Sequence, residues 1–149
     1  KSTGKVYLEG EEHDLPDLRE IVKILCSPDE GCPWDSSQTL ESLKSCLSNE
    51  ADEVLEAIDR KDRENLCEEL GDVLLQVVMQ SELAQRNGWF TLDDVIQGIS
   101  DKMIRRHPHV FTDEKFNSEE DIHERWKQIK AKEKLLKHSS KKPAAEAAL

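Results

Sequence analysis

The sequence predicts an all-α fold, a helical bundle of about five helices that dimerisation completes. Three observations favour this class. Apolar residues recur at the helical i, i+3, i+4 and i+7 spacing in successive long stretches of the chain. No stretch longer than three residues reads as a strand, and proline or Asn-Gly pairs mark the breaks between helices. At 149 residues the chain is long enough to form one domain with its own core.

The composition argues against several functional classes. The net charge of −11 disfavours a general surface for nucleic acid polymers. There is no run of about 18 apolar residues and no signal-peptide pattern, so we expect a cytoplasmic protein without a membrane partner. The four cysteines form no CxxC pair, which favours free thiols in a reducing compartment over disulfides or zinc.

The first helix is expected to begin near Asp14, which suits the N-cap, with Pro16 in its first turn. Its apolar stripe comprises Leu18, Ile21, Val22 and Leu25. It should end near Ser27, because a residue that precedes proline disfavours the helical conformation. Residues 1–13 lack a helical period, and we expect them to form a loose N-terminal arm ahead of a domain that spans residues 14–137.

Residues 28–38 are expected to form a loop, because they contain two prolines and a glycine. Trp34 is a large aromatic residue in this polar segment, and two interpretations of it stand. It packs as a lid on the core, or it offers an aromatic platform for a flat ligand such as a nucleobase.

Two long helices should follow this loop, one ending near Arg60 and the next running from Asp62 to Asn87. The polar residues 59–63 suit a short turn between them. Asn87-Gly88 supplies the C-terminal stop of the second helix.

Acidic residues are paired on both of these helices. Glu50 and Glu53 are three residues apart on the first, and Glu69 and Asp72 are three residues apart on the second. Three residues advance about 300° around a helix, so each pair shares a face, and antiparallel packing points all four carboxylates at one spot. Oxygen ligands of this kind suit Mg²⁺, Mn²⁺ or Ca²⁺. The alternative is two solvated acidic faces, because the chain contains 32 acidic residues.

A fourth helix should begin after Thr91, which suits the N-cap, and end before Pro108. The chief basic cluster lies in its last turns and comprises Lys102, Arg105 and Arg106. These cations either complement the helix dipole or clamp a phosphate, which arginine binds in a bidentate manner. Arg106 follows Arg105 directly and so should point about 100° away around the helix.

A last helix should begin at Ser118. It is highly charged and its apolar face is thin, so it either lies over the bundle or packs on a second subunit. Residues 138–149 carry no core-forming pattern, and we expect a disordered or expression-derived tail there.

Four motifs together resemble the MazG-type nucleoside triphosphate pyrophosphohydrolases of the all-α NTP pyrophosphatase superfamily. The matching pieces are Gly31 to Asp35 with Gln38-Thr39, Glu50 to Val54, Glu68 to Asp72, and Lys102 to Phe111. Their order and spacing match over roughly residues 15 to 130, which is most of the chain. The combination is specific, although each motif alone is weak.

The resemblance implies an enzyme that hydrolyses an NTP or dNTP to the monophosphate and pyrophosphate, through metal-activated water that attacks the α-phosphorus. The implied cofactor is Mg²⁺, with Mn²⁺ as the alternative. The metal ligands and catalytic residues that it implies are Glu50, Glu53, Glu69 and Asp72. It implies substrate binding by Trp34, Lys102, Arg105 and Arg106. The family usually assembles as a homodimer, or as a homotetramer built from two dimers.

One departure from the family pattern is Asn49, which stands where the family commonly has the first glutamate of EExxE. Asparagine keeps hydrogen bonding but cannot act as a base. A catalytically weakened, MazG-like regulatory or interaction module is therefore an alternative function. A ferritin-like di-iron protein is a further alternative, but that class needs two ExxH pairs and this chain has only Glu120 with His123.

Overall fold

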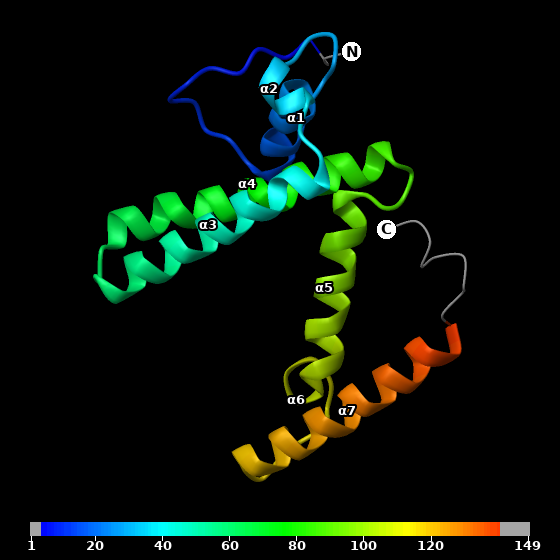
Figure 1. The fold of residues 1–149 in the computed structure, drawn as a ribbon. Coiled ribbons are helices and arrows are strands. Elements are labelled where there is room, and N and C mark those ends of the chain that lie inside the picture. Colours follow the sequence, from blue (N-terminus) through cyan, green and yellow to red (C-terminus); the bar gives the residue numbers. More distant parts are fainter. Residues whose placement is uncertain (1–3, 141–149) are drawn as a thin grey trace. The chain divides into compact units, whose positions relative to one another are not determined.

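The computed structural model describes residues 4–140, and this range contains no strand, which confirms the all-α class (Figure 1). Seven helices occur in the described part of the chain. They are α1 (Leu15–Leu25), α2 (Pro33–Ser36), α3 (Leu40–Asp59), α4 (Arg63–Arg86), α5 (Leu92–Arg106), α6 (Pro108–Phe111) and α7 (Glu119–Ser140). Within residues 4–140, none of these helices has both the length and the apolar character that a membrane crossing requires.

The five long helices are those that the sequence predicts, and the two short ones are additional. α2 and α6 have four residues each, too few to show an apolar period. Each begins with a proline, Pro33 or Pro108, whose fixed φ suits the first helical position. α7 continues to Ser140 and so includes the first residues of the predicted tail, whereas residues 141–149 lie outside the described part.

Residues 4–13 contain no helix, as the sequence predicts for this part of the arm. Lys5 Nζ lies 2.6 Å from Asp17 Oδ1 and connects the segment to the first turn of α1. Exposed ion pairs of this kind contribute little stability. The proposed boundaries of the arm, the domain and the tail remain predictions.

Side-chain caps fix where the long helices of the N-terminal half begin. Thr39 Oγ1 accepts a hydrogen bond from the backbone N–H of Ser42 at 3.1 Å, and Asp14 Oδ1 accepts one from Asp17 at 3.0 Å. In both cases the later side chain accepts from the backbone N–H of the cap, which completes a capping box. Asp62 caps α4 through its side chain alone, which accepts a hydrogen bond from the backbone N–H of Asn65. Each such cap stabilises its helix by about 1 kcal/mol.

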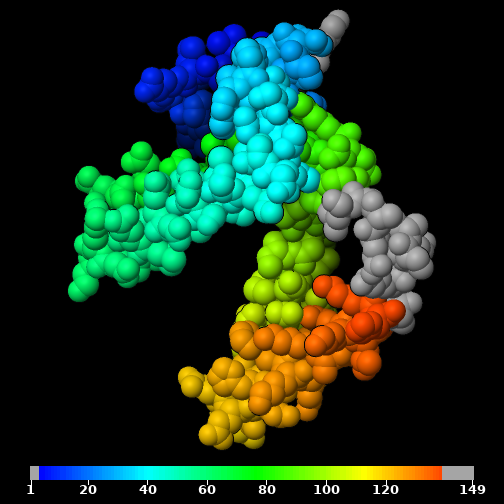
Figure 2. All heavy atoms as spheres, in the orientation of Figure 1, coloured from blue at the N-terminus to red at the C-terminus, as the bar shows by residue number. Residues whose placement is uncertain are grey.

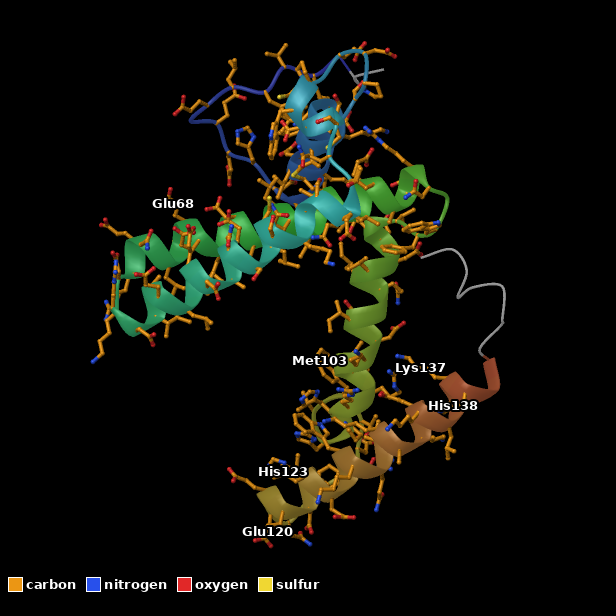
Figure 3. All side chains as sticks on the ribbon, in the orientation of Figure 1. Glu68, Met103, Glu120, His123, Lys137 and His138 are labelled. Carbon is orange, nitrogen blue, oxygen red and sulfur yellow. The ribbon has the colours of Figure 1, made fainter. Side chains whose placement is uncertain are left out.

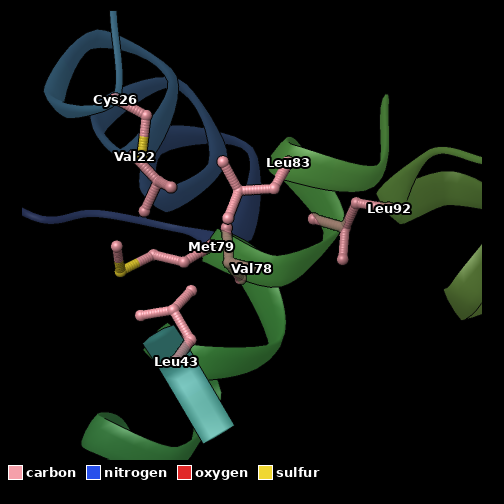
Figure 4. Packing of buried hydrophobic residues seen from close by; sticks show 7 residues of the cluster. All are labelled: Val22, Cys26, Leu43, Val78, Met79, Leu83 and Leu92. Atoms are coloured by element: carbon pink, nitrogen blue, oxygen red, sulfur yellow. The ribbon is translucent and has the colours of Figure 1, made fainter. Parts of the chain in front are cut away.

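The chain forms two compact units, Lys1–Val95 and Ile96–Leu149. The core of the first unit lies where α1 packs on the antiparallel α3–α4 hairpin (Figure 4). Its buried residues are Val22, Cys26, Leu43, Val78, Met79, Leu83 and Leu92. Leu43 of α3 and Val22 of α1 are fully buried, so this cluster anchors one end of the hairpin.

The rest of the hairpin extends past this core as a layer of two helices. In the space-filling view it projects beyond the blue residues of α1 (Figure 2). Large apolar side chains on it remain exposed in the single chain: Leu47, Leu55, Ile58, Leu70, Leu74 and Val77. Apolar surface concentrated on one element in this way is typical of a protein interface.

The second unit is held together by contacts between the end of α5 and α7. The indole Nε1 of Trp126 donates a hydrogen bond to the backbone carbonyl of Arg106. Arg125 of α7 pairs with Glu114 at 2.8 Å, and Ile129 of α7 is buried. These contacts pack α7 within this unit through its few apolar and aromatic residues.

Candidate metal centre

The two acidic pairs meet across the α3–α4 hairpin. Glu50 and Glu53 lie one turn apart on α3, and Glu69 and Asp72 lie one turn apart on α4. One carboxylate oxygen from each of these residues lies within 4.8 Å of the other three. Among the described residues, no other group of three or more His, Cys, Asp or Glu side chains converges in this way. We call these four residues the carboxylate quartet.

Two oxygens of the quartet are buried and accept no hydrogen bond, Oε2 of Glu50 and Oε2 of Glu69. A buried carboxylate oxygen without a donor is costly unless a cation or a proton compensates it. The quartet offers oxygen atoms only, which is the donor set that hard divalent cations such as Mg²⁺ and Mn²⁺ prefer. The residues present therefore fit a divalent cation.

Hydrogen bonding, burial and neighbouring charges within the quartet raise the pKa of two of its members. The pKa of Glu69 rises from 4.5 to about 7, and the largest cause is a hydrogen bond that its carboxyl shares with Glu53. Burial and the negative charges of the other quartet members raise it further. Burial is also the main cause that raises the pKa of Glu50, and Asp72 adds to it. Without a cation, the quartet therefore holds a proton up to near-neutral pH.

Several polar residues of the same motifs stay outside the quartet. Glu68 is exposed and its side chain points away from α3, so only Glu69 of the consecutive glutamates contributes (Figure 3). Asn49 is exposed on α3. Glu120 and His123, labelled in the same view, belong to no converging group of ligands in the described chain, so the di-iron alternative gains no support (Figure 3).

Trp34 lies in α2 and is 59% exposed, so its interpretation as a lid on the core is wrong. Ser37 Oγ and Gln38 Nε2 donate hydrogen bonds to the Trp34 carbonyl at 2.7 and 2.9 Å and fix this turn. Gly31 seats the segment on the end of α1, where a Cβ would lie 2.3 Å from the carbonyl oxygen of Leu25. The Gly-Cys-Pro-Trp run thus leaves an indole open to solvent.

Arg105 and Arg106 converge on a single carboxylate of α7. Arg105 Nε lies 2.7 Å from Glu133 Oε1, and Arg106 Nη2 lies 2.9 Å from Glu133 Oε2. Arg105 and Arg106 differ by about 100° in helix phase, and their long side chains nevertheless reach the same carboxylate. The pKa of Glu133 falls to about 2, and its hydrogen bond with Arg106 is the largest cause.

A basic cavity of about 660 Å³ lies around this pairing. Lys102, Arg105 and Arg106 line it from α5. α7 adds cations that the sequence analysis did not assign to a site: Arg125, Lys130, Lys132, Lys134 and Lys137. Three of these lysines follow the i, i+4, i+7 spacing of one helix face, which is the signal that the sequence carried. Such a concentration of positive charge attracts polyanions.

Comparison with known proteins decides the family. The family model described as the MazG nucleotide pyrophosphohydrolase domain matches residues 38–111. The crystal structure of a mazG-related protein from Thermotoga maritima matches with a TM-score of 0.67 and 33% identity, over 78% of this chain and 99% of that chain. This chain belongs to the MazG family.

Curated relatives of this MazG domain are longer proteins. The chain is 50% identical to "Nucleoside triphosphate pyrophosphohydrolase/pyrophosphatase MazG" of Thermotoga maritima, over 84% of the chain and 47% of that protein. It is 43% identical to "Nucleoside triphosphate pyrophosphohydrolase" of Escherichia coli K12, over 80% of the chain and 46% of that protein. It is 49% identical to "Uncharacterized protein YabN" of Bacillus subtilis, over 86% of the chain and 26% of that protein. The chain thus spans about a quarter to about half of these relatives.

The raised pKa of Glu69 predicts that added Mg²⁺ stabilises the protein more at high pH than at low pH. A carboxyl whose folded-state pKa is raised from 4.5 to about 7 destabilises the fold as pH rises through that window. Mg²⁺ replaces the proton, so the rise in Tm on adding it should be larger at about pH 8 than at about pH 5. Circular dichroism melts with Mg²⁺ or with EDTA measure this difference.

The matched variants for this experiment are Glu69→Gln and Glu68→Gln, neighbouring residues of which only the first belongs to the quartet. Glu69→Gln should weaken the effect of Mg²⁺, and Glu68→Gln should preserve it. An equal rise in Tm at both pH values, or the same loss in both variants, contradicts the assignment.

The depressed pKa of Glu133 predicts an acid-sensitive contact in the second unit. A carboxylate whose folded-state pKa falls from 4.5 to about 2 stabilises the fold fully above about pH 4.5 and loses this effect as pH falls towards 2. Glu133→Gln should therefore lower the free energy of unfolding at neutral pH, and its difference from the parent should shrink below about pH 4.5. Denaturant unfolding at several pH values measures this, with the exposed Glu124→Gln on the same helix as the control. A difference that does not change with pH would show that the ion pair is not the cause.

Proposed function

We propose that this MazG domain hydrolyses nucleoside triphosphates to the monophosphate and pyrophosphate in a Mg²⁺-dependent reaction, with Mn²⁺ as an alternative metal. The observation that carries this proposal is the convergence of four carboxylates within 4.8 Å, with two buried oxygens that lack a donor. The names of the relatives from Thermotoga maritima and Escherichia coli support the same activity.

In this proposal Glu50, Glu53, Glu69 and Asp72 hold the cation. A divalent cation there supplies charge neutralisation of the phosphate oxygens and lowers the pKa of water. The attack is directed at the α-phosphorus, so that pyrophosphate is the leaving group. No Ser, Cys or His nucleophile is required, because the charge of the polyphosphate is the main barrier to attack by water.

The remaining predicted residues serve the substrate in this proposal. Trp34 stacks on the base, and its exposed indole supports that role. Lys102, Arg105 and Arg106 bind the polyphosphate, and the basic cavity that they line supports this. Arg105 is 48% exposed and Arg106 is 22% exposed, so Arg105 is the more accessible partner for a phosphate that replaces Glu133.

The substrate in this proposal is a small nucleotide, NTP or dNTP, and not a nucleic acid polymer. The net charge of −11 disfavours a polymer partner, while a local basic cavity suits a short polyphosphate. We expect the protein to work in the cytoplasm, and the four free cysteines fit a reducing compartment.

A MazG-like regulatory or interaction module remains the second candidate function. It is favoured by Asn49, whose amide cannot take a proton from water. A module of this kind would bind Mg²⁺ and nucleotide without turnover, so the two functions differ in a single assay.

The proposed function predicts pyrophosphate release from members of a panel of NTPs and dNTPs in the presence of Mg²⁺. In oxygen-18 water the label should appear in the monophosphate, because water attacks the α-phosphorus. Orthophosphate with NDP as products, or label in the pyrophosphate, would contradict the proposed reaction, and binding without turnover would favour the regulatory module.

Asp72→Asn should reduce this turnover by more than about 100-fold, because even residues that only support metal ligands contribute 10- to 100-fold. The variant should keep its helix content by circular dichroism. The control is Asp52→Asn, the same change at an exposed position of α3, which should retain activity. Equal activity in both variants would contradict the role of the quartet.

We further propose a homodimer, or a homotetramer built from two dimers, because the hairpin that carries the quartet exposes apolar side chains on both of its helices. Leu55 and Leu70 are 59% and 52% exposed in the single chain. Light scattering at micromolar concentration should give at least twice the mass of the chain. Leu55→Glu should shift the mass towards the monomer, and a monomeric parent protein would contradict the proposal.

A further inference from the structure

Gln76 is a buried polar residue whose side-chain oxygen receives no hydrogen bond from the described residues. Its side chain is 7% exposed, and its Oε1 accepts no hydrogen bond. The other buried polar residue among those described is Ser81, whose hydroxyl donates to the Val77 carbonyl at 2.7 Å. Of these two residues, Gln76 therefore has a buried oxygen that lacks a partner.

The position of Gln76 on α4 connects it with the quartet. It lies one turn after Asp72 and two turns after Glu69 on the same helix. Seven residues advance about 700°, so the side chains of Glu69 and Gln76 leave the helix within about 20° of each other. Gln76 thus extends the quartet's face of α4 towards the apolar core that contains Val78 and Met79.

Folding alone does not explain an amide at this position. A leucine of similar volume would pack beside the core without leaving an unpaired polar atom. The buried core cluster, to which Leu43, Val78 and Met79 belong, consists of apolar side chains and Cys26, and no donor reaches Gln76 Oε1 among the described residues. The amide therefore has a use other than packing.

The chemistry of the unpaired atom limits what its partner is. An amide oxygen only accepts hydrogen bonds, so its partner must be a donor. When a cation is bound, Glu69 and Asp72 are ionised, so they only accept hydrogen bonds and cannot supply that donor. A divalent cation bound by the quartet would bring hydration water with it. An O–H group of that water can donate the missing hydrogen bond to Gln76 Oε1.

We propose that Gln76 is a positioning residue of this site, whose Oε1 accepts a hydrogen bond from a hydration water of the divalent cation that the quartet holds. This inference rests on the proposed function for the presence of the cation. An amide does not take up a proton at neutral pH, so Gln76 orients the water and does not deprotonate it.

The test compares Gln76→Leu with Gln76→Glu and uses Mn²⁺ alone as the first probe. Calorimetry should show that Gln76→Leu binds Mn²⁺ about tenfold more weakly than the parent. Loss of a residue that supports the ligands of a metal typically lowers metal affinity by about 10- to 100-fold. Gln76→Glu keeps an acceptor at the same place and should restore the affinity. In EDTA, Gln76→Leu should have a Tm equal to or above that of the parent, because it removes an unpaired buried atom.

Turnover supplies a second readout. Gln76→Leu should lower kcat about tenfold with little change in KM, and Gln76→Glu should recover part of the loss. Gln85→Leu is the control, because Gln85 is an exposed residue on the opposite side of the same helix. It should leave Mn²⁺ affinity and kcat unchanged.

Two results would overturn the inference. The first is a Gln76→Leu variant that keeps the parent's Mn²⁺ affinity. The second is a fall in its Tm in EDTA, which would make the amide a structural group with an internal partner. If the parent binds Mn²⁺ but hydrolyses no nucleotide, the proposed function fails while the affinity comparison still decides the role of Gln76. If the parent binds no Mn²⁺, both fail.

Discussion

The repulsion among four carboxylates is the constraint on which the site depends. Oxygens of Glu50, Glu53, Glu69 and Asp72 lie within 4.8 Å of one another, a distance at which like charges repel strongly in a protein. Two arrangements relieve this repulsion. One is a shared proton, which the raised pKa of Glu69 indicates, and the other is a divalent cation. The hairpin keeps the quartet on two helices outside the apolar core, where a cation can replace the proton without unfolding the unit.

One part of the α3–α4 hairpin packs in the apolar core, and another part carries the candidate metal site. Near its open end, α1 packs on it through Val22 and Cys26, and this cluster stabilises the fold. Further along, three buried polar atoms on α3 and α4 lack hydrogen-bond partners, Glu50 Oε2, Glu69 Oε2 and Gln76 Oε1. Unpaired buried atoms destabilise a fold, so their concentration on this short stretch indicates a site that a ligand completes. The exposed apolar residues of the same hairpin indicate that a second chain also contributes to its stability.

Most features that depend on residues close together in the chain, such as the long helices and the paired carboxylates, were predicted from the sequence. Capping residues such as Asp14 and the apolar periods located the five long helices, and the i, i+3 spacing predicted the convergence of the quartet. Features that depend on distant contacts were missed. Glu133 lies 28 residues from Arg105, and no periodicity indicates that it pairs with both arginines.

α2 and α6 were missed because one turn is too short for an apolar pattern, and the exposure of Trp34 depends on how Gly31 seats its loop. Gln76 is one turn from Asp72, but burial, which only the structure gives, distinguishes it from other glutamines.

The central claim is that the carboxylate quartet holds a divalent cation. The most direct measurement is an anomalous difference map from crystals of this protein grown with Mn²⁺. The account predicts a peak among the side chains of Glu50, Glu53, Glu69 and Asp72, at coordination distances of about 2.0–2.3 Å from their oxygens. The peak should disappear in crystals of Asp72→Asn grown in the same way. A strong Mn²⁺ peak elsewhere, with none at the quartet, would contradict the account.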